Sequence, residues 1–206
     1  MALKDYSDLN AMQLDVLKEI GNIGTGNAAT SLSAMLQKPV NISVPTISVL
    51  EYEDVVNRLG GPETMIVGIM LTITGEFNGM MMFLLEKDFA HGIVNDLLGG
   101  SFQGFSELDE LSISALNEIG NIMAASYVNA IAQLTGLTID ISVPAMAVDM
   151  VGAIMSVPAI FFANISDKVI FIQDEFKGAS ENMTSHILLI PTADSLERIM
   201  RNLGVC

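Results

Sequence analysis

A glutamate and an asparagine, three residues apart, occur twice in this chain with the same neighbours. Glu19 and Asn22 belong to the pentapeptide Glu-Ile-Gly-Asn-Ile, which recurs unchanged 99 residues later with Glu118 and Asn121. A carboxamide donates and accepts hydrogen bonds, so it can orient a water molecule for in-line attack. A carboxylate can pair with a Lys or Arg of a partner, or accept the proton of the water. Neither group is a good nucleophile here, so the pair suits hydrolysis of a bond that is already activated.

Each copy of the pair belongs to a polar stripe along a predicted helix. At about 100° per residue, positions i, i+4 and i+7 fall within about 60° of one another, roughly opposite the apolar side chains of the same segment. These positions hold Asp15, Glu19 and Asn22 in the first copy, and Ser114, Glu118 and Asn121 in the second.

A solvated helix face would explain one such stripe, but repetition favours a function. Asn costs about 0.5 kcal/mol relative to Ala inside a helix, so an exposed Asn would be expected to change after a duplication. Lys18 has become Asn117 and Gln13 has become Ser112, yet the Glu and the Asn remain in both copies. We therefore interpret both pairs as functional residues.

The duplication reaches well beyond the pentapeptide. Shifted by 99 positions, the chain matches itself without a gap for about forty residues, and Pro45 falls on Pro144. A period near half of the 206 residues favours two halves that share one core. We expect a single domain made of two repeats, about residues 8–100 and 107–205.

Each repeat is predicted to contain a long helix, a strand, a hairpin and a closing helix. Apolar and polar residues alternate after each long helix, which indicates half-buried strands, and Asn78-Gly79 is a strong hairpin signal. The predicted N-caps are Ser7 or Asp8, Asp88 and Asp194. The predicted helices cover about residues 7–37, 52–59, 88–98, 107–135 and 194–203, and the predicted strands cover 40–45, 65–74, 80–85, 139–144, 153–163, 168–172 and 187–190.

The expected fold class follows from the hairpins between neighbouring strands. A parallel sheet would instead show an alternation of strands and helices. We predict an α+β fold: an internally duplicated, mostly antiparallel sheet with long helices packed on it and pseudo-twofold symmetry. The second repeat has no clear counterpart of the short helix at 52–59.

The charge of the chain limits the kinds of partner that it is expected to bind. Nine basic and 24 acidic residues give a formal charge of −15, which would repel phosphate backbones and anionic lipid heads.

The most apolar stretch, residues 141–162, contains Pro144, Asp149 and Pro158, so it predicts buried strands rather than a membrane span. The N-terminus has no apolar segment of a secretory signal, and the lone Cys206 cannot form an internal disulfide. We expect a cytoplasmic protein that binds no nucleic acid and does not insert into a membrane.

Methionines, glycines and histidines have simpler explanations than a binding site. The 14 methionines, including residues 80–82, are interpreted as core filling, with a Met-rich docking surface as the alternative. Gly21, Gly24 and Gly26 invite comparison with a phosphate-binding loop, but the second copy keeps only Gly120, which favours close helix packing. The histidines have no Cys or acidic cluster at ligand spacing, so no metal site is expected.

The two stripes, with the prolines that follow them, resemble the signature of a known family. The pattern Asp15-x3-Glu19-x2-Asn22 with Pro45 23 positions later, and its copy Ser114-x3-Glu118-x2-Asn121 with Pro144, resemble that of the CheC/CheX/FliY family of bacterial chemotaxis phosphatases. The resemblance covers nearly the whole chain. Two motifs in one short chain are similar to the CheC-type members, since CheX-type members carry one motif and dimerise.

The resemblance implies that the chain hydrolyses the phosphoryl group of the aspartyl-phosphate response regulator CheY. In that family the motif Asn orients the attacking water, a role that Asn22 and Asn121 would take. The motif Glu contacts a conserved lysine of the regulator, a role that Glu19 and Glu118 would take. No cofactor of its own is implied, because Mg2+ would come from the regulator. The deamidase CheD is implied as a second partner.

The alternative is a non-catalytic interaction module that binds CheD, the response regulator or both. Such a module would use the stripes for docking alone. Intact motifs in both halves favour the phosphatase.

Overall fold

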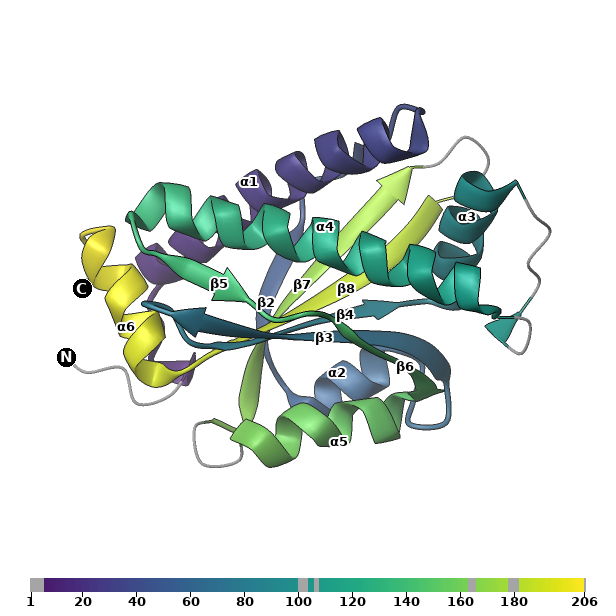
Figure 1. Ribbon diagram of the computed structural model, residues 1–206. Helices are drawn as coiled ribbons and strands as arrows, with labels where there is room; N and C mark the ends of the chain where they lie inside the picture. The colour runs from purple at the N-terminus through teal and green to yellow at the C-terminus, as the bar shows by residue number, and fades with distance from the viewer. Residues whose placement is uncertain (1–5, 100–103, 106–107, 163–165, 178–181, 206) are drawn as a thin grey trace.

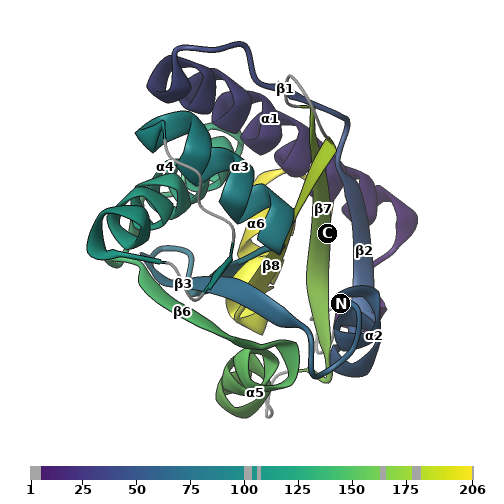
Figure 2. The ribbon, with the colours of Figure 1, turned by 90° about the vertical axis from the view of Figure 1, so that its right-hand side faces the viewer.

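An eight-stranded sheet forms the centre of the molecule, and every strand pair described in it is antiparallel. The computed structural model describes residues 6–99, 104–105, 108–162, 166–177 and 182–205. The long helices α1 (Ala11–Leu36) and α4 (Glu110–Thr135) cover one face together with α3 (Lys87–Leu98), while α2 (Tyr52–Arg58) and α5 (Val151–Phe162) lie on the opposite side (Figures 1 and 2). The predicted α+β fold is therefore confirmed.

The sheet interleaves strands from the two halves of the chain. The strands are β1 (Asn41–Ile42), β2 (Thr46–Glu51), β3 (Met65–Gly75), β4 (Gly79–Leu85), β5 (Ile139–Ile141), β6 (Ala145–Met150), β7 (Lys168–Lys177) and β8 (Asn182–Pro191). Their order is β1-β7-β8-β4-β3-β5, with β2 also on β7 and β6 also on β3. The first two strands of each half thus pair with the third strand of the other half: β1 and β2 pair with β7, and β5 and β6 pair with β3. Strands β4 and β8 meet at the pseudo-twofold axis. The internal duplication builds one shared core.

Helix starts differ from their predicted positions. Asn10 caps α1: its side-chain oxygen accepts a hydrogen bond from the backbone N–H of Gln13 at 3.0 Å, and its own N–H donates to the Gln13 side chain at 2.9 Å. A short 3-10 helix, η1 (Tyr6–Asp8), precedes it. Near α1 and α6 several Ser, Thr, Asp and Asn residues can serve as caps, so the choice there depends on tertiary contacts. At α3 the N-cap residue makes no capping bond with its side chain. The observed N-caps of α1, α3 and α6 (Ala193–Asn202) are Asn10, Glu86 and Thr192, in place of Ser7 or Asp8, Asp88 and Asp194.

Helix α5 is the largest correction. The sequence predicted a strand at 153–163 and no second short helix, whereas α5 is a helix that matches α2 in the order of elements. The mostly apolar segment has no clear period that separates a buried strand from a helix. The first amides of α5 donate to loop carbonyls far away in the sequence, from Val151 to Thr64 at 2.8 Å and from Gly152 to Pro62 at 2.9 Å. Residues 107, 163 and 206, which the predictions also include, lie outside the described residues.

Two strands were not predicted, and one turn works differently. The strands β2 and β6 each begin directly after the proline that ends the predicted alternating segment. The hairpin between β3 and β4 is confirmed, but Gly75, with φ 103°, provides its left-handed residue. Gly79 instead lies in β4, where an added Cβ would be 2.5 Å from the carbonyl oxygen of Ile190. That glycine allows close approach of two strands rather than a turn.

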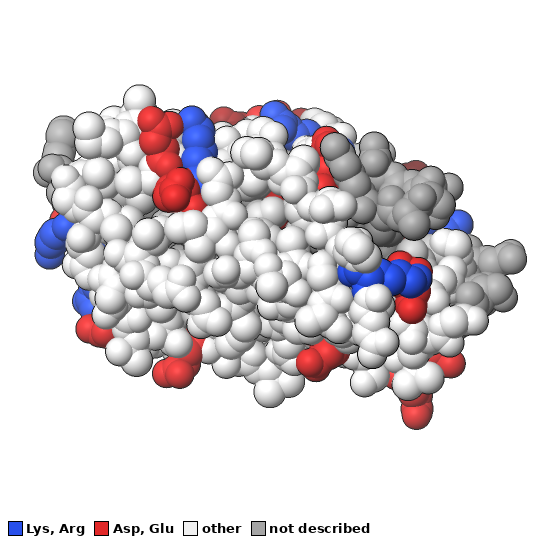
Figure 3. Space-filling model, turned by 90° about the horizontal axis from the view of Figure 1, so that it is seen from above, with Lys and Arg blue, Asp and Glu red and all other residues white. Residues whose placement is uncertain are grey.

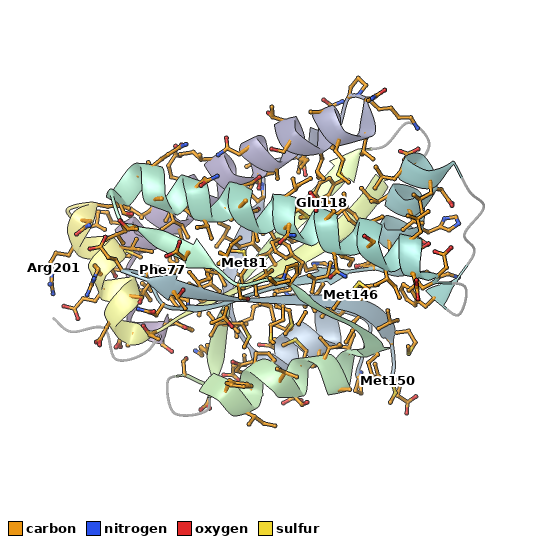
Figure 4. All side chains as sticks on the ribbon, viewed as in Figure 1. Phe77, Met81, Glu118, Met146, Met150 and Arg201 are labelled. Atoms are coloured by element: carbon orange, nitrogen blue, oxygen red, sulfur yellow. The ribbon has the colours of Figure 1, made fainter. Side chains whose placement is uncertain are left out.

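The core lies between the sheet and the helices on both sides. Met80, Met81 and Met82 are buried in it, so core filling is confirmed for these methionines; Met81 is labelled within the sheet layer in Figure 4. Among the described residues, no helix combines the length and the apolar character needed to cross a membrane.

Candidate functional site

Helices α1 and α4 pack against each other on one face of the sheet, and each turns its polar stripe away from the core. The apolar residues predicted for the core face, Leu17 and Ile20 of α1 and Leu116 and Ile119 of α4, are buried. The opposite face of each helix carries the stripe, and Figure 4 shows Glu118 in the helical layer above the sheet. The stripe residues Asp15, Glu19, Asn22, Ser114 and Glu118 are exposed, and Asn121 is half-buried.

The glycine between each Glu and Asn lets its helix approach the sheet closely. An added Cβ at Gly21 would lie 2.5 Å from the Ile47 side chain of β2, and one at Gly120 would lie 2.7 Å from Ile69 of β3. Real Cβ atoms do not approach so closely, so a side chain here would require the isoleucine or the helix to shift. Close helix packing is therefore confirmed for both glycines of the repeated pentapeptide.

The motif prolines lie where each edge of the sheet changes strand. Pro45 is buried between β1 and β2, and its ring is 3.6 Å from the position of a Cβ on Gly21. Pro144 occupies the equivalent place between β5 and β6 and is half-buried. The structure thus brings Pro45 next to the pentapeptide that precedes it by more than twenty residues.

The Glu and Asn side chains of both pairs are free to bind a partner. Within the described part of the chain, the side chains of Glu19, Asn22, Glu118 and Asn121 form no hydrogen bond and no ion pair. A helix interior satisfies its own backbone groups, so these side chains are not needed as caps. Their hydrogen-bonding capacity is directed to solvent.

The first stripe position differs between the copies in its contacts as well as its residue type. Asp15 accepts a hydrogen bond from the ammonium group of Lys18 at 2.8 Å, on the exposed surface. In the second copy Ser114 and Asn117 occupy these positions, so the ion pair has been replaced as a unit. An exposed pair of this kind contributes little to stability. The shared chemistry of the two copies is therefore the Glu and the Asn.

A buried triangle of oxygen atoms joins the two helices to the sheet, and sequence patterns did not reveal it. The Thr25 hydroxyl of α1 lies 2.7 Å from the Tyr127 hydroxyl of α4; Thr25 donates to Asp174 of β7 at 2.9 Å, and Tyr127 donates to the other carboxyl oxygen at 2.8 Å. Gly24 makes room for the ring of Tyr127, since an added Cβ would lie 2.6 Å from it. The triangle fixes α1 against α4 just beyond Asn22.

Burial controls the protonation of this triangle. Desolvation raises the pKa of the Asp174 carboxyl, against the lowering effect of the hydrogen bonds from Tyr127 and Thr25 and of nearby His186. Burial, together with Asp174, also raises the pKa of Tyr127 well above 10. The raised pKa means that the Asp174 carboxyl takes up a proton more readily here than in water.

The described residues offer no resident metal site. No group of three or more His, Cys, Asp or Glu side chains in that part of the chain could hold a metal ion. Both histidines have local partners: a ring nitrogen of His91 is 3.0 Å from the Asn95 amide, and Nε2 of His186 is 2.8 Å from a Glu86 oxygen.

A family signature matches both repeats of this chain, and several known proteins are similar to it. The sequence signature of the CheC-like family matches residues 12–49 and 111–147. The CheY-P phosphatase CheC of Bacillus subtilis (strain 168) is 30% identical over 203 residues, which cover 97% of this chain and 97% of that protein. The flagellar motor switch phosphatase FliY of the same organism is 31% identical over 143 residues, 69% of this chain and 37% of that protein. The crystal structure of Thermotoga maritima FliY matches with a TM-score of 0.76 and 26% identity, over 95% of this chain and 98% of that one.

Proposed function

Because this chain belongs to the CheC-like family, we propose that it is a phosphatase of the phosphorylated response regulator CheY. Two similar proteins of Bacillus subtilis are named as phosphatases. One of them is named as a CheY-P phosphatase, and this chain matches it over nearly its full length. The reaction is hydrolysis of an aspartyl phosphate: water attacks phosphorus, the bond to the aspartate oxygen breaks, and phosphate and a free carboxylate result. The proposed location is the cytoplasm, where such a regulator acts.

Asn22 and Asn121 are the proposed water-orienting residues. A carboxamide can accept a hydrogen bond from water with its oxygen and donate one to a phosphoryl oxygen with its nitrogen, which aligns the water behind the phosphorus. Glu19 and Glu118, one helical turn earlier, are proposed to pair with a lysine of the regulator and so hold the two proteins in register. Mg2+ is proposed to come with the regulator and to neutralise charge on the phosphoryl group.

One observation carries this proposal: the same Glu and Asn are presented outward on two different helices, and neither pair has a partner within the described residues. A polar side chain with a structural role usually has a hydrogen-bond partner within the protein. A polar side chain without a role is free to be substituted after a duplication. Here the pair is unengaged and yet repeated. A ligand outside the chain supplies the reason for both facts.

A non-catalytic interaction module is the second candidate, with CheD, the regulator or both as its partners. Helix α5 favours some protein contact away from the stripes, because Ile160 and Phe161 are exposed on the other side of the sheet. CheD is proposed as a partner from family membership alone. Such a module could bind the regulator but would not turn over.

Turnover separates the two candidates. Phosphorylated CheY is mixed with this protein at one-tenth of its concentration, and phosphate release is followed in the presence of Mg2+. The phosphatase shortens the lifetime of the whole phosphorylated population. A binder changes at most one-tenth of it, and that result would sink the proposal. The Asn129→Ala variant, which removes an exposed Asn of α4 two turns beyond Asn121, is the matched control and keeps the parental rate.

A further inference from the structure

Four large apolar side chains are exposed in two pairs that follow the duplication. Met12 and Leu111 are 63% and 60% exposed, and Val44 and Val143 are 80% and 86% exposed. The members of each pair are 99 positions apart, like the two pentapeptides. A single exposed apolar residue needs no explanation. Two positions that stay both apolar and exposed in each repeat do need one.

Both positions border the polar stripes. Met12 lies three residues before Asp15, so it continues the first stripe by one turn toward the start of α1, and Leu111 does the same on α4. Val44 directly precedes Pro45, whose ring packs beside Gly21 next to Asn22. Val143 directly precedes Pro144. The first Glu and Asn pair therefore has an apolar residue at one end and another beside it, and Leu111 and Val143 occupy the equivalent positions of the second repeat.

We infer that these four residues, which we call the apolar rim, are docking contacts for the phosphorylated response regulator. The inference rests on the proposed function and extends it from the reacting groups to the surface that selects the partner. The rim is continuous with the proposed water-orienting and lysine-pairing residues, so a regulator seated on one pair covers the rim beside it. The rim fits a regulator whose phosphorylated aspartate is surrounded by apolar side chains.

The charge distribution supports this partner. The chain carries a formal charge of −15, yet the face above the helices is mostly uncharged, with charged side chains in a few small groups (Figure 3). An interface centre of apolar anchors around a few charged groups excludes water from the polar contacts. In the inferred interface the rim supplies the anchors, and the Glu of each stripe supplies the charge.

The test uses a single active site. In the Asn121→Ala background, Val44→Asn and Met12→Gln are each expected to raise the KM for phosphorylated CheY by about fivefold or more, with kcat unchanged, because they remove binding common to substrate and transition state. A matched change in the same background, Met150→Gln, alters an exposed methionine near α5 and leaves KM and kcat unchanged (Figure 4).

Affinity measured without turnover separates this inference from the proposed function. CheY loaded with beryllofluoride, a stable substitute for the phosphoryl group, is titrated into each variant, and the rim variants are expected to raise the Kd of the first site by the same factor as KM. If the chain proves inactive, a raised Kd still supports the rim. An unchanged Kd overturns it whatever the activity. A change in the mass of the free protein by light scattering, with Kd unchanged, would assign the rim to self-association instead.

Discussion

The hydroxyl of Tyr127 donates a hydrogen bond of 2.8 Å to the buried carboxyl group of Asp174, and this bond ties α4 to the sheet. Thr25 of α1 contacts both groups, so one triangle holds the two helices that carry the stripes. The residues are far apart in the sequence and none repeats in the other half: the positions equivalent to Thr25 and Tyr127 hold Ala124 and Ala28. The two repeats have the same fold, but only this one set of positions carries the triangle.

Tyr127→Phe is expected to lower the free energy of unfolding by about 1–3 kcal/mol, because it leaves one buried carboxyl oxygen of Asp174 without a partner. Denaturant unfolding measures the change. Tyr52→Phe is the matched control: its hydroxyl donates to the Pro158 carbonyl at 3.3 Å from a half-buried position, so a loss below about 1 kcal/mol is expected. Equal losses in the two variants would show that the triangle contributes nothing special.

Asp174→Asn is expected to change how stability depends on pH. Because the pKa of Asp174 is raised in the folded state, the carboxyl favours folding while it is protonated. That contribution is complete below the unfolded pKa of about 4 and is lost as pH rises through the folded pKa. The Asn amide can donate to Tyr127 and accept from Thr25, so the variant keeps the triangle without a titrating group.

The comparison is made by denaturant unfolding from about pH 4 to pH 8. The parent is expected to lose stability relative to Asp174→Asn as pH rises, until the folded pKa is passed and the difference becomes constant. A difference that stays flat over the whole range would mean that the carboxyl titrates normally in the folded protein.

Two glycines of α1 are expected to respond in opposite directions to alanine. Gly21→Ala places a methyl group within 2.5 Å of Ile47 and should cost about 1–3 kcal/mol. Gly26→Ala meets nothing within 4 Å and should stabilise the helix by about 0.5–1 kcal/mol. Thermal or denaturant unfolding of both variants decides the matter. If Gly21→Ala is neutral or stabilising, the close packing of the pentapeptide on β2 is not required.

The stripes could be predicted from the sequence, because helical geometry alone fixes which residues share a face. The long helices and the hairpin strands were predicted for the same reason, since local periodicity marks them, whereas β2 and β6 were not predicted. Helix α5 could not be predicted: its apolar run has no period, and its first amides bind carbonyls at Pro62 and Thr64. The triangle of Thr25, Tyr127 and Asp174 depends on three elements meeting, and no local pattern contains that information.

Charge reversal at the proposed docking carboxylates is expected to weaken regulator binding. Glu19→Lys and Glu118→Lys together should raise the Kd for beryllofluoride-loaded CheY by about tenfold, because each places a cation against the lysine of the regulator. The effect should shrink in high salt. Glu53 lies on α2 and is exposed on the other side of the sheet. Glu53→Lys changes the net charge by as much as each of the two substitutions and should leave Kd within about twofold. Unchanged affinity in the double variant would remove both Glu residues from docking.

The most direct test of the account replaces both proposed water-orienting residues. Phosphate loss from phosphorylated CheY is measured with the parent, with Asn22→Ala, with Asn121→Ala and with the double variant, and Asn27→Ala on α1 serves as a control outside the stripe. Each single variant is expected to keep the activity of the other site. The double variant should lose at least about 100-fold and approach the regulator's own rate. A double variant that works at the parental rate would contradict the account.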